Sequence, residues 1–279
     1  MATHLSPRRI ESTPTASAGE TRQFLTHHSI TDDELMRELW NVSSGLPGLL
    51  DARPPGSAPR QFMRRGERDY TYNPATGRYR RVANGKLVTE RELRSAVFKV
   101  STEAKNRVRK ETEAMMAGTI LFVIWYARMR SVMKALLRAV WAVTWGGILF
   151  EDDSSRVAFY LWSIFMFENI DKFKIAVESG TMNWTRRIVA YAGSRARAAN
   201  GMYQNAKLVV AERRGHNEAR RVLGENENHC HDDEKRGLPG CVELASLGWL
   251  PIKKIVPIGD ATCNGNCLCQ IETRKRPNA

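Results

Sequence analysis

The strongest constraint on the fold is a helical repeat of apolar residues in the middle of the chain. Apolar side chains recur there at steps of three or four residues: Leu121, Trp125, Met129, Val132, Leu136, Val140 and Val143. Basic side chains follow one another at steps of four on another side: Arg130, Lys134 and Arg138. This spacing predicts an amphipathic α-helix that buries one face. Gly146-Gly147 predicts where the helix ends.

Two neighbouring segments predict further helices. Thr89 and Glu92 have the spacing of a capping box, so we expect a helix to begin there and to continue to about Glu113. After the acidic run 151–153, Ser154 is the candidate N-cap of another helix. One apolar stripe of that helix comprises Phe159, Trp162, Met166, Ile170, Phe173 and Val177, and a second comprises Tyr160, Ile164 and Phe167. A helix that is apolar on two sides is expected in the centre of a bundle or against another subunit.

A last long helix is predicted from Asn183. Its apolar positions follow helical steps: Trp184, Ile188, Tyr191, Ala198, Met202, Ala206 and Val209. Its other positions are strongly basic: Arg186, Arg187, Arg195, Arg197, Lys207, Arg213 and Arg214. These side chains are candidates for contact with nucleic acid or an acidic partner, and an ordinary solvent-exposed face explains them as well.

Composition divides the chain into three regions. Residues 1–66 are rich in Pro, Ser, Gly and Arg, so we expect a flexible basic arm that contains one short helix after Thr31. Residues 67–223 form the predicted helical body. It opens with a small β-hairpin predicted within 67–88, where two turn signals, Asn73-Pro74 with Gly77 and Asn84-Gly85, flank short Tyr, Val and Arg segments. Residues 224–279 are rich in Gly, Pro and Cys. The predicted fold class is therefore mainly α: a helical bundle with a disordered N-terminal arm, a small hairpin and a small Cys-rich C-terminal module.

The charge balance limits the class of partner. Lys and Arg number 43 against 30 Asp and Glu, a formal charge of +13 that favours phosphate polymers or acidic protein surfaces. The longest uncharged stretch, residues 114–127, is shorter than the roughly 20 apolar residues that span a bilayer. The first 20 residues contain no apolar segment typical of a secretory signal. We therefore expect no membrane association.

No catalytic signature is apparent. The sequence contains no G-x-x-x-x-G-K-[ST] phosphate loop, no G-x-S-x-G elbow and no G-x-G-x-x-G dinucleotide motif. It also lacks the His-Glu-x-x-His pattern of zinc peptidases. We therefore expect a binding or structural protein and not an enzyme.

All five cysteines lie near the C-terminus: Cys230, Cys241, Cys263, Cys267 and Cys269. Structural zinc takes about four N or S ligands in tetrahedral geometry, so four of the five are candidate ligands, with His229 or His231 as substitutes. Ten residues separate Cys230 from Cys241, which is wider than the usual spacing of a ligand pair, but a turn at Pro239-Gly240 would bring Cys241 toward Cys230. The alternative is that the cysteines are reduced or disulfide-bonded without metal. A site saturated with thiolates leaves no open position for water, which argues against catalytic zinc.

Several motifs together resemble the tailed-phage head morphogenesis proteins, the Mu F-like minor capsid proteins. They are NPATGRYRR before a long helix, the helix end at Gly146-Gly147, the Arg- and Ala-rich helix, Leu247-Gly248-Trp249, Pro257-Ile258-Gly259 and the final CNGNCLC. The resemblance covers about residues 70–275. Family members typically have a tight C-x-x-C where this chain has Cys230 and Cys241, and many have a His where Cys263 stands here.

The resemblance implies a structural minor component of a phage or prophage head, made in the host cytoplasm and present in the virion. Its partners would be the portal and the major capsid or scaffold proteins, with packaged DNA contacted by non-specific charge, and it would act in head morphogenesis and in DNA packaging or ejection. The alternative is a zinc-containing nucleic-acid-binding protein. That function requires a helix or strand presenting Arg, Asn or Gln beside the metal, whereas the residues after Cys241 are mostly apolar.

Overall fold

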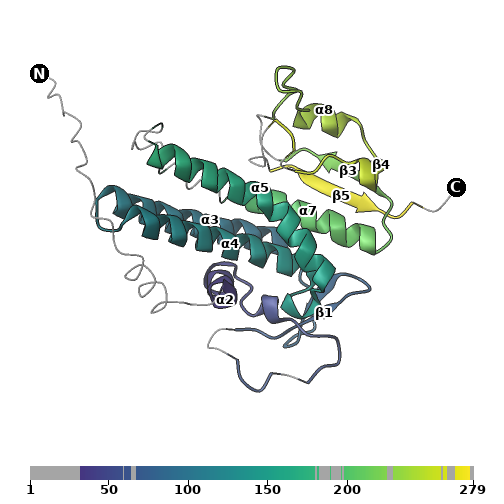
Figure 1. The fold of residues 1–279 in the computed structure, drawn as a ribbon. Helices are drawn as coiled ribbons and strands as arrows, with labels where there is room; N and C mark the ends of the chain where they lie inside the picture. Colours follow the sequence, from purple (N-terminus) through teal and green to yellow (C-terminus); the bar gives the residue numbers. More distant parts are fainter. Residues whose placement is uncertain are drawn as a thin grey trace, which may run out of the picture. The chain divides into compact units, whose positions relative to one another are not determined.

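The structure is a computed structural model. It describes residues 32–58, 60–63, 67–179, 181, 189, 196, 198–224, 229–258, 260–262 and 268–276, except the side chains of 162, 165, 166 and 169. Within these ranges the chain is mainly helical, with a two-stranded hairpin and a three-stranded sheet (Figure 1). The predicted fold class is confirmed. Residues 1–31 of the predicted arm lie outside the described residues.

Two long helices form the centre of the body, as the sequence predicts. Helix α3 (Glu90–Met116) begins at the capping box of Thr89 and Glu92, in which the Glu92 N–H donates to Thr89 Oγ1 at 3.2 Å. Helix α4 (Phe122–Trp145) ends at Gly146, which has a left-handed backbone with φ of 107°. The two helices pack against each other, and every apolar residue of the predicted α4 stripe except Leu121 is buried.

Helix α5 (Asp153–Glu178) differs from the prediction in two respects. Its N-cap is Asp152 and not Ser154, because the Asp152 carboxylate accepts the Ser155 N–H at 2.7 Å. It is also not central to the bundle: Phe159 and Phe173 are buried, but Tyr160 is 66% exposed. The 3-10 turn η2 (Ile148–Phe150) joins α4 to α5. Of the helices described, none is both long enough and apolar enough to span a bilayer.

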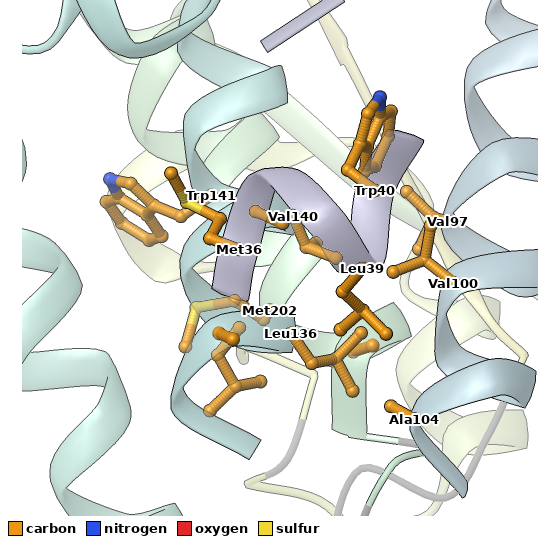
Figure 2. Packing of buried hydrophobic residues seen from close by; sticks show 14 of the residues in the cluster. Met36, Leu39, Trp40, Val97, Val100, Ala104, Leu136, Val140, Trp141 and Met202 are labelled. Atoms are coloured by element: carbon orange, nitrogen blue, oxygen red, sulfur yellow. The ribbon is translucent and has the colours of Figure 1, made fainter. Parts of the chain in front are cut away.

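Residues 32–52 belong to the body and not to a flexible arm. Helix α2 (Asp32–Ser43) lies against α3 and α4, and the 3-10 turn η1 (Leu49–Asp51) follows it. Figure 2 shows Met36, Leu39 and Trp40 of α2 among apolar side chains of α3, α4 and α7. The apolar side chains of this short helix thus pack on its own chain.

The predicted hairpin forms and attaches to the end of α4. Strands β1 (Tyr70–Asn73) and β2 (Arg78–Arg81) are antiparallel, with Tyr72 opposite Tyr79. The Tyr79 hydroxyl donates to the Val143 carbonyl of α4 at 2.6 Å. The Tyr72 ring covers Gly146, where a Cβ atom would collide with it. Glycine at the helix end is therefore required both by the backbone conformation and by this contact.

The C-terminal part is a small sheet packed on helix α7 (Ala198–Arg213). Strand β3 (Glu218–Val222) is central and pairs antiparallel with β4 (Leu250–Pro251) and β5 (Gln270–Arg274). Helix α8 (Cys241–Ser246) and the 3-10 turn η4 (Ile252–Lys254) lie in the connection between β3 and β5. The predicted body, 67–223, therefore ends too late, because β3 belongs to the C-terminal sheet.

We call residues 218–276 the C-terminal module and residues 32–213 the helical body. Helix α7 faces both. Its side chains Ala199, Met202, Tyr203, Ala206 and Val210 lie in the core of the helical body, whereas Leu208 and Ala211 lie in the smaller core of the module. Most of the first half of the predicted last helix, residues 183–197, lies outside the described residues.

Candidate metal centre

Three of the five cysteines converge in the core of the C-terminal module. Cys241 is the first residue of α8 and Cys269 immediately precedes β5; both side chains are fully buried. Cys230 is partly buried and packs against the same apolar cluster. Cys263 and Cys267 lie outside the described residues. Sequence positions almost 40 residues apart are thus close in space.

The loosely spaced pair, Cys230 and Cys241, is brought together by a tight backbone contact. A Cβ atom on Gly240 would collide with the backbone of His231 and Asp232, so only glycine allows the two segments to approach this closely. The Asp232 carboxylate accepts the Gly240 N–H at 2.5 Å. The Cys241 N–H then donates to Cys230 Sγ at 3.3 Å. Ten intervening residues therefore do not prevent the pairing that the zinc hypothesis requires.

Cys269 is held beside the same segment from the other direction. Its sulfur lies 4.0 Å from His229 Nδ1. Its carbonyl accepts a hydrogen bond from Asn200 Nδ2 of α7 at 3.2 Å. Gly224 allows a second close approach, because a Cβ there would collide with the carbonyl of Leu268. Of the two candidate substitute ligands, His229 is therefore the one near a cysteine sulfur.

The other candidate, His231, contacts a carboxylate. Its Nδ1 lies 2.8 Å from Glu243 Oε1 of α8. This hydrogen bond holds the pKa of Glu243 below its ordinary value. The His231 side chain is mostly exposed. His231 thus fixes the entry into α8 and is the weaker candidate for a ligand.

A buried arginine contacts the sulfur of Cys241. The Arg221 side chain extends from β3 into the module core, and the residue is only 2% exposed. Its Nη1 donates to Cys241 Sγ at 3.3 Å, and its Nη2 donates to the carbonyls of Val256 at 2.7 Å and Pro257 at 3.1 Å. Sequence reasoning missed this residue. The only signal was strand alternation, which places Arg221 on the same face as Ala219.

Polar side chains of α7 hold the loops of the module. Asn205 forms two reciprocal bonds with Ile258, donating to its carbonyl at 2.9 Å and accepting its N–H at 3.0 Å. Gln204 Oε1 accepts the Ile271 N–H at 3.0 Å. Both amide residues are buried. These contacts hold Ile258 and Ile271 against α7. The only sequence signal for them is the presence of polar residues among the apolar residues of this helix.

The described residues do not by themselves form a metal site. Among them, no group of three or more His, Cys, Asp or Glu side chains is arranged to hold a metal ion. The chemistry of the donors nevertheless suits zinc, because thiolate ligands are stabilised by N–H donors such as those that reach Cys230 and Cys241. Cys230, Cys241 and Cys269, with His229, are the described residues whose sulfur and nitrogen donors suit zinc, and they lie as two pairs, Cys230 with Cys241 and Cys269 with His229.

The basic residues proposed for partner contact are engaged within the chain where they are described. Lys207 Nζ pairs with Glu90 at 2.7 Å, and Arg213 pairs with Asp152 at 2.7 Å. Arg214 donates to the Tyr72 hydroxyl. These three side chains therefore tie α7 to α3, α5 and the hairpin. The other candidates lie outside the described residues: Arg186, Arg187, Arg195 and Arg197.

Comparison with known proteins found no match: no family model, no curated protein and no solved structure is similar to this chain.

Proposed function

We propose that this chain is a structural minor head protein of a tailed phage or prophage. In this role it associates with the portal and with the major capsid or scaffold protein, and it acts in head morphogenesis and in DNA packaging or ejection. It is made in the host cytoplasm and ends in the virion. Packaged DNA is contacted only through non-specific charge.

The observation that carries the proposal is the spatial arrangement of the motifs that resemble the Mu F-like proteins. The NPATGRYRR hairpin and Gly146 meet at the end of α4 through Tyr72. Ile258, of the Pro-Ile-Gly motif, is fixed to α7 by Asn205. Trp249, of the Gly-Trp motif, lies against the guanidinium groups of Arg220 and Arg274. The guanidinium carbons lie 4.8 and 4.2 Å from the centroid of the Trp249 ring. These three contacts give the described parts of the motifs defined packing roles, which supports a resemblance in architecture.

The cysteine cluster has a structural role in this proposal. Zinc would bind to four of Cys230, Cys241, Cys263, Cys267 and Cys269, with His229 or His231 as a substitute. The ion would supply the folding free energy that so small a core lacks. The residues of the chain supply the framework: Gly240 sets the approach of the first pair, and α7 holds the two loops.

Mass spectrometry of purified particles tests the proposal. Particles are separated by density gradient from a lysate of the host that carries this sequence, and the fractions are searched for peptides of the chain. We expect the chain in the particle fraction together with the portal protein. Its presence in the lysate and absence from the particles would contradict the proposal.

The rival function is tested by DNA binding across salt. A structural head protein should bind duplex DNA without sequence preference, with an affinity that falls steeply as salt increases. Tight, sequence-selective binding that persists at high salt would instead support a zinc-containing nucleic-acid-binding protein. Near the cysteines, α8 presents Glu243 and apolar residues, a surface poorly suited to reading bases.

A further inference from the structure

The environment of Arg221 is unusual for a charged side chain. The residue is almost completely buried, and its hydrogen-bond acceptors are the carbonyls of Val256 and Pro257 and the sulfur of Cys241. Its Nε–H, also buried, has no hydrogen-bond partner in the described part of the chain. No carboxylate among the described residues lies within ion-pair distance of it. The carboxyl of Asp260 is farther away: burial raises its pKa, and the Arg221 charge offsets part of that rise. A guanidinium is always protonated in proteins, so a positive charge is enclosed here.

A buried charge is costly unless an opposite charge balances it. Carbonyl oxygens are neutral, so of the three acceptors only the sulfur can carry a full negative charge. A cysteine sulfur bound to zinc is a thiolate. A metal ion with several thiolate ligands also holds an excess of negative charge, and a nearby guanidinium offsets that excess.

We propose that Arg221 is a positioning residue of the metal centre, which orients Cys241 Sγ toward the metal and balances the negative charge of its ligands. The inference rests on the metal centre of the proposed function, but not on the phage role. Arg221 is fixed from three sides, by strand β3 and by the two carbonyls of 256–257. The direction of its Nη1–H, and hence of the sulfur lone pair that it engages, is thereby set before metal binds.

Each cysteine of the pair Cys230 and Cys241 accepts one hydrogen bond at its sulfur. The backbone N–H of Cys241 donates to Cys230 Sγ, and Arg221 Nη1 donates to Cys241 Sγ. The donor to Cys230 is a backbone N–H, which a side-chain substitution does not remove. The donor to Cys241 is a side chain, which a substitution at Arg221 does remove. Outer donors of this kind typically contribute about 10–100-fold to metal affinity.

Matched variants of one strand separate this role from a general effect on the sheet. Arg221→Met removes the charge and all donors at similar length. Arg221→Lys keeps the charge but cannot reach the sulfur and both carbonyls at once. Arg220→Met is the control, because Arg220 lies on the opposite face of β3, is 42% exposed and pairs with Glu272.

The experiment measures zinc affinity of the reduced full-length chain by competition with a chromophoric chelator. We expect Arg220→Met to bind like the natural chain, Arg221→Met to bind about 10–100-fold more weakly, and Arg221→Lys to fall between them. With cobalt in place of zinc, the thiolate-to-metal charge-transfer band of Arg221→Met should move to lower energy, because the sulfur loses a hydrogen bond. A merely structural role would not shift that band in folded protein.

Several outcomes would overturn the inference. One is an Arg221→Met affinity within twofold of the natural chain, and another is an equal loss in Arg220→Met. If Arg221→Met fails to fold, Arg221→Lys decides: natural affinity and an unshifted cobalt band would contradict the proposal. A natural chain that binds no zinc would also overturn it, while detection of the chain in virions would leave the proposed phage role standing.

Discussion

The helical body and the C-terminal module are held together by different interactions. The body buries a large contiguous set of apolar side chains, including Trp40, Trp125 and Trp141, all 0% exposed. The module core is much smaller, and two of its fully buried members are Cys241 and Cys269, with the charged Arg221 beside them. Burial of apolar area stabilises the first region. The C-terminal module buries too little apolar area to be stabilised in this way alone. We therefore propose that its buried thiols and Arg221 contribute to stability through metal binding.

The interface between the regions reflects the same difference. Toward the body, α7 presents small and apolar side chains such as Ala199 and Ala206. Toward the module it presents Asn200, Gln204 and Asn205, each bonded to a backbone group. An amide surface tolerates water better than an apolar one. The comparison therefore predicts that the module can be disrupted while the body stays folded.

The largest effect is expected from removing cysteines. Replacing Cys263 and Cys269 with Ser should release metal and unfold the module, while the helical body is spared. Hydrogen exchange followed by mass spectrometry should show loss of protection in residues 229–258 and 268–276 and retained protection in α3 and α4. Chelation of the natural chain should reproduce the pattern. Full protection of the module in the double variant would show that its structure does not depend on these cysteines, which contradicts the proposed difference between the two regions.

The next largest effect is expected from a cavity in the body. Leu136 is fully buried in α4, so Leu136→Ala should lower the free energy of unfolding by about 3 kcal/mol. Urea unfolding followed by far-UV circular dichroism measures the change. Leu161→Ala is the control, because Leu161 is 58% exposed on α5. Equal losses in the two variants would argue against the assigned core.

A smaller effect is expected where the hairpin meets α4. Tyr79→Phe removes the hydroxyl that donates to the Val143 carbonyl at 2.6 Å. A buried hydrogen bond of this type contributes about 1 kcal/mol, so the thermal midpoint should fall by a few degrees. Tyr160→Phe, on an exposed side chain, should leave it unchanged. An unchanged thermal midpoint in Tyr79→Phe would contradict a stabilising role for the bond between the hairpin and α4.

The smallest effect concerns acid stability at the start of α5. The Arg213 guanidinium and the Ser155 N–H lower the pKa of Asp152 from 3.8 to about 2. A carboxylate with a lowered folded pKa stabilises the fold above its unfolded pKa, and this contribution is lost as pH falls through the folded value. Asp152→Asn keeps a helix cap but lacks the charge.

The stability of that variant should therefore fall less steeply than that of the natural chain between about pH 4 and pH 2. Thermal melts across this range measure the slope. Asp153→Asn, whose side chain is fully exposed in the natural chain, should retain the natural slope. Identical slopes in all three proteins would contradict the assigned partner of Asp152.

Local signals in the sequence predicted much of the body. The capping box at Thr89 and the stripe from Trp125 to Val143 were confirmed, because helix caps and helical periodicity are properties of neighbouring residues. The second stripe of α5 was expected in the centre of the bundle or against another subunit. Phe167 of this stripe packs against the core, but Tyr160 is exposed on this chain. Periodicity identifies an apolar face such as that of Tyr160, but which element covers it depends on the tertiary fold.

The candidate site was predicted less completely. Its cysteines are recognisable from their type and clustering, but the contact that joins Cys230 to Cys241 depends on Gly240 meeting residues 231–232. The burial of Arg221 depends on carbonyls about 35 residues away in the chain. The Pro239-Gly240 turn indicated that Cys241 could approach Cys230. The contacts of Arg221 join segments distant in the sequence and leave no periodic pattern, so they could not be predicted.

Metal analysis of the purified natural chain tests most directly whether the two regions differ in what stabilises them. The chain is prepared reduced, without added metal or chelator, and zinc is quantified by mass spectrometry of the intact protein under native conditions. We expect a near-stoichiometric zinc ion that is lost together with the structure of the C-terminal module on acidification. A metal-free chain whose module is nevertheless folded would contradict it.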